Sequence, residues 1–319
     1  MKPKCSPANP HRLLKTSASS LFYRFILLPL SRLPFWFLYG VSDFLYLVLY
    51  RLIGYRTKVV AGNLKLAFPE KTAAERQVIQ DGFYHYFFDL IIETIKNFTI
   101  SEAEAVLRCR VLNPEILDDF AARGRSVIGV GGHNCNWEMA ALAFSSQFAP
   151  HLTMGVFSPL KDRFLNRAIR QNRMRFGTLL VDRRRVPEYY QFNRETGRMT
   201  LDFYMADQSP STANKRRLVW AEFLTQLTGF YPGPEKYARE QDMPVVFACM
   251  VPTGERGFQT VQMTLITERP REEEDGFIMR RYAELLEAQI RASPTHYLWT
   301  HKRWKHAVPQ EIREEFYGK

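Results

Sequence analysis

The sequence predicts an α/β protein whose mostly parallel central sheet is covered by helices and preceded by an N-terminal hydrophobic helical segment. From residue 126 onward, short apolar runs that suit strands alternate with longer amphipathic runs that suit helices. Such alternation is typical of a parallel sheet with helices on its faces. A second observation is that residues 21–55 are far more apolar and aromatic than the chain that follows.

The predicted elements follow from hydrophobic period and from breaker residues. Strands are predicted at 126–130, 152–157, 179–181, 199–205, 244–251 and 257–267. Helices are predicted at 56–69, 72–97, 112–122, 136–147, 162–176, 187–196, 234–241 and 271–292, with a short one after Pro309. Thr72 and Glu75 form a capping-box pattern at the start of the longest N-terminal helix. No repeat or linker follows residue 55, so 56–319 is expected to be one domain.

The N-terminal region divides into two parts. Residues 1–20 are polar and basic without helical period, which predicts a mobile basic arm. Residues 21–55 predict a hydrophobic membrane-associated segment. Its apolar run from 33 to 50 approaches the ~20 residues that a spanning helix needs. The alternatives are a helix lying in the interface and a helical pair packed on the domain. No signal-peptide cleavage pattern is evident.

Charge and cysteine content restrict the partners and the compartment. The chain has 44 basic and 33 acidic residues, a net charge of +11. Such an excess favours an acidic partner: an anionic membrane surface, an acidic protein or a nucleic acid. Nucleic acid is not expected, because no recognised binding motif is present and the apolar N-terminus would be unexplained. The four cysteines lack paired spacing, which indicates a reducing compartment.

The candidate catalytic residues follow the predicted strand 126–130. Two glycines come first, then His133, with Glu138 five positions later. Residues five apart on one helix point about 140° apart, so the two side chains meet only if His133 lies in the turn and Glu138 in the first helical turn. Glu138 would then fix the tautomer of His133 and raise its basicity. The competing interpretations are a helix cap or surface hydrogen bond, and a zinc site of His133, Cys135 and Glu138. No second Cys/His cluster supports the zinc site.

Further candidates lie at strand and helix ends. Asp207 follows the predicted strand 199–205, and carboxyl ends of parallel strands share one edge of a sheet, so Asp207 and His133 could share a rim. The alternative for Asp207 is an Asx-turn before Pro210. Lys236 lies where a helix start could cradle an anion. Arg303 belongs to an aromatic and basic run, 297–305, which suits a lipid headgroup boundary or a phosphate site. Arg163, Arg173 and Arg175 lie on the basic helix 162–176.

These segments together resemble a known family. The run His133-Asn-Cys-Asn-Trp-Glu138 resembles the His-x4-Asp/Glu signature of glycerolipid-type acyltransferases. The order of the remaining segments resembles the late lipid A acyltransferases, which transfer lauroyl or myristoyl chains onto the lipid A precursor. The segments are Phe157-Ser-Pro-Leu-Lys, Asn172-Arg-Met-Arg-Phe-Gly, Ala206-Asp-Gln-Ser-Pro, Gly233-Pro-Glu-Lys-Tyr-Ala and Tyr297-Leu-Trp-Thr-His-Lys-Arg-Trp-Lys.

The resemblance implies a glycerolipid-acyltransferase-like fold, an acyl carrier protein as donor and an anionic glycolipid as acceptor. It places the protein on the cytoplasmic face of the cell inner membrane and requires no metal or organic cofactor. It implies that His133 is the general base, oriented by Glu138, and that backbone N–H groups after Gly132 or Arg173 bind the oxyanion. The expected substrate-binding residues are Arg163, Arg173, Arg175, Asp207, Lys236 and Arg303.

One departure bears on the arginines. Where many members have Tyr-Arg-Pro or Tyr-Lys-Pro, this chain has Phe157-Ser158-Pro159. If that base contacts substrate phosphate or the oxyanion, then Arg163, Arg173 or Arg175 must replace it. Three other functions remain as alternatives: an acyltransferase for a lyso-phospholipid or aminolipid, a non-catalytic peripheral membrane-binding protein, and, more remotely, a metal hydrolase.

Overall fold

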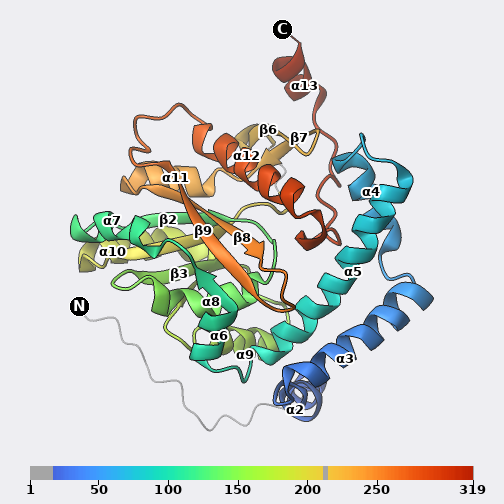
Figure 1. Cartoon of the computed structure of the whole chain (residues 1–319). Helices are drawn as coiled ribbons and strands as arrows, with labels where there is room; N and C mark the ends of the chain where they lie inside the picture. Colours follow the sequence, from blue (N-terminus) through green and yellow to red (C-terminus); the bar gives the residue numbers. More distant parts are fainter. Residues whose placement is uncertain (1–16, 211–214, 319) are drawn as a thin grey trace.

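The central feature of the computed structural model is a seven-stranded mixed sheet of order β1-β9-β8-β2-β5-β3-β4 (Figure 1). The structure describes residues 17–210 and 215–318. Five neighbouring strands, β8 to β4, are parallel, whereas β9 runs antiparallel to β8 and β1 runs parallel to β9. The strands are β1 Cys109–Val111, β2 Val127–Gly131, β3 Leu152–Phe157, β4 Leu179–Asp182, β5 Thr200–Met205, β8 Val245–Pro252 and β9 Gln259–Thr267.

Helices cover both faces of the sheet and create two apolar cores (Figure 1). Ile128 and Val130 of β2 pack with α5, α10, α11 and α12, while Val127 packs on the other face with α6, α7 and α8. This division follows from the period of two along a strand. The helices are α4 Thr57–Ala67, α5 Ala73–Lys96, α6 Glu102–Arg108, α7 Asp118–Ala122, α8 Trp137–Gln147, α9 Arg163–Arg173, α10 Val186–Thr196, α11 Gly233–Gln241, α12 Phe277–Ala292 and α13 Gln310–Tyr317.

The predicted fold class is confirmed, and each predicted strand is present. Among the elements that were not predicted are α6, the three-residue strand β1, and a hairpin of β6 Val219–Phe223 and β7 Gln226–Phe230. The hairpin turns at Leu224 and Thr225, both with positive φ, so it lacks the Gly or Asn that normally indicates such a turn.

Two predicted helices needed correction. The helix expected at 271–292 begins only at Phe277, after Gly276 in the left-handed region. The helix expected at 112–122 is divided into a 3₁₀ turn, Pro114–Leu117, and α7.

The N-terminal segment is helical and exposes apolar side chains. It comprises α1 Ala18–Phe22, α2 Leu28–Ser31 and α3 Phe35–Leu45, with π-helical stretches at Tyr23–Leu27 and Tyr46–Leu52. The continuous stretch Phe35–Leu52, called the apolar helix below, is long and apolar enough to cross a membrane by length and composition, and 22% of it is buried. It packs along α5 (Figure 1). The arm predicted at 1–20 mostly lies outside the described residues, but its last residues, from Ala18, belong to α1.

Candidate active site

The site forms where two adjacent parallel strands end. β2 pairs with β5 so that Gly131 lies opposite Met205, the last residue of each strand. His133 and Asp207 each lie two residues beyond that pair, at the same edge of the sheet. The sequence-based prediction that these two residues share a rim is therefore confirmed, and the reason is the matched register of two strands.

Asp207 is the carboxylate that holds His133. Its Oδ1 lies 2.6 Å from Nδ1 of the imidazole, and its Oδ2 accepts the backbone N–H of His133 at 3.0 Å. The Asp207 side chain is 2% exposed and that of His133 15%. Burial alone would lower the pKa of His133, but the charge of Asp207 and its hydrogen bond raise it above its ordinary value. Burial would raise the pKa of Asp207, but His133 holds it below its usual range.

The second ring nitrogen of His133 is available for chemistry. With a proton on Nδ1 donated to Asp207, Nε2 carries a lone pair. The amide nitrogen of Gln208, the residue after Asp207, lies 3.3 Å from Nε2 and donates to it in this tautomer. The Trp137 ring meets the imidazole edge-on, with centroids 5.0 Å apart. Nε2 of His133 thus faces the amide of an exposed glutamine.

The loop that carries His133 is shaped by close packing. A Cβ on Gly132 would lie 2.3 Å from Leu286, so glycine is needed there for space, whereas the left-handed residue of the loop is Cys135, with φ 48°. The thiol of Cys135 points to the carbonyl of Met250, 3.5 Å away, and is 3% exposed. Burial raises its pKa. Cys135 is therefore a packing residue and does not converge with His133 and Glu138 on a shared point, as the zinc alternative would need.

Glu138 binds an arginine in this structure. It lies in the first turn of α8, as predicted, behind the N-cap Asn136, whose Oδ1 accepts the Met139 N–H at 2.8 Å. Its carboxylate takes two hydrogen bonds from Arg173 at the end of α9: Nε donates to Oε2 at 2.8 Å, and Nη2 donates to Oε1. The expectation that Glu138 orients His133 must therefore be corrected, because Asp207 occupies that position and Glu138 orients Arg173 instead.

The backbone groups expected to bind an oxyanion are already used. The N–H of His133 donates to the Asp207 carboxylate. The N–H of Asn134 donates to the Gly132 carbonyl, and that of Cys135 donates to the His296 carbonyl. The other group expected to bind the oxyanion is Arg173. Within residues 17–210 and 215–318, its Nη1 has no hydrogen-bond partner, while the side chain borders the cavity beside His133.

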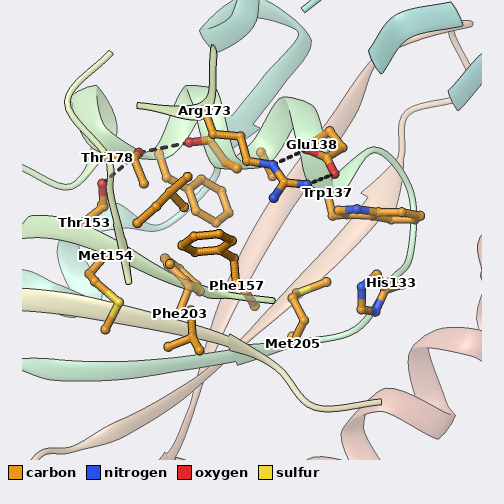
Figure 2. Close-up of a pocket in the computed structure, with 18 of the residues that line it drawn as sticks. His133, Trp137, Glu138, Thr153, Met154, Phe157, Arg173, Thr178, Phe203 and Met205 are labelled. Carbon is orange, nitrogen blue, oxygen red and sulfur yellow. Dashed lines mark hydrogen bonds and ion pairs between the residues drawn. The ribbon is translucent and has the colours of Figure 1, made fainter. Parts of the chain in front are cut away.

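This cavity, of about 320 Å³, extends from His133 between α8 and the sheet. Its wall is mainly apolar, and Figure 2 shows the aromatic rings of Phe157 and Phe203 between its two ends. His133 and Trp137 lie at one end, and Thr153 and Thr178 lie at the other, where their hydroxyl oxygens are 3.1 Å apart (Figure 2). Remaining lining residues include Ala140, Ala141, Phe144, Met154, Gly155, Val156, Leu180, Met205 and Met250.

The other predicted substrate residues lie elsewhere. Arg175 donates to the carbonyls of Asn97, Phe98 and Ile100, which cap the end of α5. Arg163 is exposed at the start of α9, and Lys236 is exposed beside Glu240 at 3.8 Å.

Arg303 lies in the interior. It is 4% exposed, stacks 4.8 Å from the Phe230 ring and lowers the pKa of Asp207. Tyr297 and Trp299 of the same run are buried as well, whereas its two lysines, Lys302 and Lys305, are exposed.

The comparison with known families completes this description. A base backed by a buried carboxylate, next to an apolar cavity, defines a site suited to moving or cleaving acyl chains. The family model described as bacterial lipid A biosynthesis acyltransferase matches residues 7–306. The chain therefore belongs to this family of acyltransferase enzymes. A search of curated proteins found no match.

Proposed function

We propose that this protein transfers a fatty acyl chain from the thioester of an acyl carrier protein to a hydroxyl of a lipid A precursor. The observation that carries the proposal is the position of His133 at one end of a largely apolar cavity. Its Nδ1 is hydrogen-bonded to the buried carboxylate of Asp207, which leaves Nε2 as the acceptor. Membership of the lipid A acyltransferase family supports the reaction class. The carrier-protein donor comes from the family resemblance.

The proposed chemistry begins with proton removal. Nε2 of His133 takes the proton of the acceptor hydroxyl, and the hydroxyl oxygen attacks the thioester carbonyl carbon. The Asp207 carboxylate stabilises the imidazolium that forms. The tetrahedral intermediate then collapses, the carbon–sulfur bond breaks, and the departing thiolate takes the proton from His133. The products are an ester and the free carrier thiol, so the enzyme returns to its starting state.

Arg173 is the proposed oxyanion donor, with Glu138 as the residue that holds it in place. A bidentate pair fixes the guanidinium plane and leaves Nη1 for the substrate. Preorganised donors of this kind are effective because they need no reorientation as charge develops. This role would also account for Ser158, since the arginine or lysine usual at that position is replaced by an arginine from α9.

Arg173→Lys is expected to lower kcat by about 10²- to 10³-fold, the usual cost of losing one oxyanion donor. A lysine cannot bind Glu138 through two bonds and also present a third nitrogen. Arg175→Lys is the matched control, because Arg175 lies two residues away and its guanidinium donates to backbone carbonyls and not to Glu138. Steady-state kinetics of both variants test this role. Equal losses of kcat in the two variants, or no loss of kcat in Arg173→Lys, would contradict Arg173 as the oxyanion donor.

The cavity is proposed to hold the acyl chain. Its mainly apolar wall suits a hydrocarbon, and the hydroxyls of Thr153 and Thr178 lie at the end away from His133. A Cβ on Gly155 would lie 3.3 Å from Leu180, so even a methyl group narrows this space.

Gly155→Ala is expected to reduce kcat/KM for the longest accepted chain by about 10-fold or more relative to a chain two carbons shorter, since one methylene in an apolar pocket is worth at least that factor. Gly62→Ala is the control, because Gly62 lies on α4 with no other group within 4 Å of a Cβ. Competition between acyl donors of different length measures the ratio. An unchanged ratio in Gly155→Ala would exclude this cavity as the acyl site.

The surroundings of α9 support a location at the membrane surface. Arg163 and Arg167 are exposed on it and Lys161 just before it, and Tyr23, the residue after α1, packs against its start, where the rings of Tyr23 and Phe164 lie 5.5 Å apart. Exposed Phe22, Phe25 and Ile26 extend from that contact. Apolar side chains next to basic ones suit an anionic leaflet. We propose that the protein lies at the cytoplasmic face of the inner membrane.

The test of this function uses purified protein in phosphatidylglycerol-containing vesicles. Acyl carrier protein and coenzyme A thioesters are offered as donors, and a lipid A precursor, a lyso-phospholipid and an aminolipid as acceptors. The proposal predicts transfer to the lipid A precursor from the carrier-protein thioester. Transfer only to one of the other acceptors would support the alternative acyltransferase, and vesicle binding without transfer from any donor would support the non-catalytic function.

A further inference from the structure

A buried carboxylate on α5 reaches the catalytic loop from the side opposite the acyl cavity. Glu93 is 5% exposed and accepts two hydrogen bonds. Its Oε2 takes the side-chain N–H of Asn136 at 2.6 Å, and its Oε1 takes the hydroxyl of Tyr39 at 3.0 Å. Asn136 precedes α8, and Tyr39 belongs to the apolar helix. Glu93 therefore connects the N-terminal segment to the first turn of α8.

Asn136 is fixed by its whole set of polar groups. Its N–H donates to Gln259 at 2.6 Å, its carbonyl accepts from the same side chain at 3.0 Å, and its Oδ1 caps α8 through Met139. Glu93 provides the remaining bond, to Nδ2. Trp137 and Glu138 follow immediately, so the direction of α8 and the place of the Glu138–Arg173 pair depend on this residue.

The apolar helix is also held to α5 by several polar contacts near Tyr39. Arg256, in the turn between β8 and β9, binds Asp43 of the apolar helix and Asp89 of α5, each at 2.6 Å. Ser42 also donates to Asp89. The turn comes so close that a Cβ on Gly257 would lie 1.9 Å from the Tyr39 hydroxyl. The apolar helix, α5 and this turn thus meet at one polar junction, bordered by a second cavity of about 440 Å³.

Burying a charged carboxylate at this place costs folding free energy. Burial raises the pKa of Glu93 to about 7, although Asn136, Tyr39 and the guanidinium of Arg108 favour the charged form. A buried ionisable group is tolerated where its hydrogen bonds specify an arrangement that apolar packing would not. The arrangement specified here joins the seating of the apolar helix to the residues that hold Arg173.

We propose that Glu93 is a positioning residue for acyl transfer, which through Asn136 sets the first turn of α8 and through Tyr39 makes that setting depend on the apolar helix. This inference rests on the proposed function. It assigns Glu93 no contact with substrate. It predicts that breaking either hydrogen bond lowers turnover without weakening substrate binding, because the groups that act in the transition state are misplaced.

The test uses two variants and a matched control. Asn136→Ser keeps a side chain that caps a helix well but cannot reach Glu93. Tyr39→Phe removes only the hydroxyl at the other end. Tyr50→Phe is the control: Tyr50 also lies on the apolar helix and donates to a carboxylate of α5, Asp81, which has no contact with Asn136. In vesicles, kcat and KM are measured for all three, with amide hydrogen exchange at residues 136–139.

Asn136→Ser and Tyr39→Phe are expected to lower kcat by about 10-fold or more, with little change in KM. A loss of this size is what a small displacement of catalytic groups produces. Exchange at the Met139 amide is expected to become faster, while Tyr50→Phe resembles the wild type in both measurements. Equal losses in Tyr50→Phe, or unchanged kcat and exchange in Tyr39→Phe, would overturn the inference. If the wild type itself transfers no acyl chain, the proposed function fails, and the exchange measurement still decides whether Glu93 fixes α8.

Discussion

His133→Ala is expected to lower kcat for acyl transfer by about 10²- to 10⁴-fold, the contribution typical of a positioned general base. In the proposed mechanism, Nε2 of His133 is the only group that takes the proton of the acceptor hydroxyl. The neighbouring Gln208 amide cannot replace it, since an amide is not basic enough to accept that proton. Purified variant and wild type are compared with a carrier-protein thioester and a lipid A precursor.

The fold should survive this substitution. The loop remains held by the Tyr86 hydroxyl, which donates to the Cys135 carbonyl at 2.6 Å, and by the Tyr282 hydroxyl, which donates to the Gly131 carbonyl at 2.8 Å. His85→Ala is a control, because His85 is exposed, stacks on Tyr46 at 3.7 Å and does not line the cavity beside His133. Wild-type turnover in a folded His133→Ala protein would show that another group is the base.

Asp207→Asn is expected to have an effect of similar size, about 10²- to 10⁴-fold on kcat, because it removes most of the benefit of a correctly held base. An asparagine can present its N–H to Nδ1, which would place the imidazole proton on Nε2 and block it. The substitution also removes the negative charge that stabilises the imidazolium. Both effects act on the chemical step, so KM should change much less than kcat.

The pH dependence of kcat/KM should also change in a defined direction. Because Asp207 raises the pKa of His133 above its ordinary value, and because the base must be neutral, wild-type kcat/KM should rise with pH through a midpoint above the ordinary value of about 6.5. Asp207→Asn should move that midpoint to lower pH for the activity that remains.

Glu138→Gln tests the other carboxylate. It should lower activity through Arg173 and move the midpoint less. A full shift in Glu138→Gln with none in Asp207→Asn would restore Glu138 as the partner of His133.

The local patterns in the sequence predicted much of the fold. The alternation after residue 126 predicted each strand of the parallel part of the sheet, because a buried strand is a short apolar run ended by turn residues. The capping box at Thr72 and Glu75 is present as predicted. What the patterns could not predict was pairing: strand order, the hairpin with its unusual turn, and β1 all depend on contacts between distant residues.

The candidate site shows the same division. His133 and Glu138 were found from spacing, yet the partners of each come from other elements: Asp207 follows β5 and Arg173 ends α9. Spacing within one motif limits which residues can meet, but it does not choose among carboxylates that the fold brings to the same edge. Placement of Asp207 on the shared rim was available from the sequence, whereas Glu93 gave no signal, since it reads as one polar residue in a long helix.

The most direct test of the central claim is mass spectrometry of lipid A from cells that lack their own copy of this enzyme. Cells complemented with the wild-type chain should carry one acyl chain more than cells complemented with His133→Ala, with both proteins present in equal amounts in the membrane. Identical lipid A from the two strains would contradict the account that His133 is the base for acylation of a lipid A precursor.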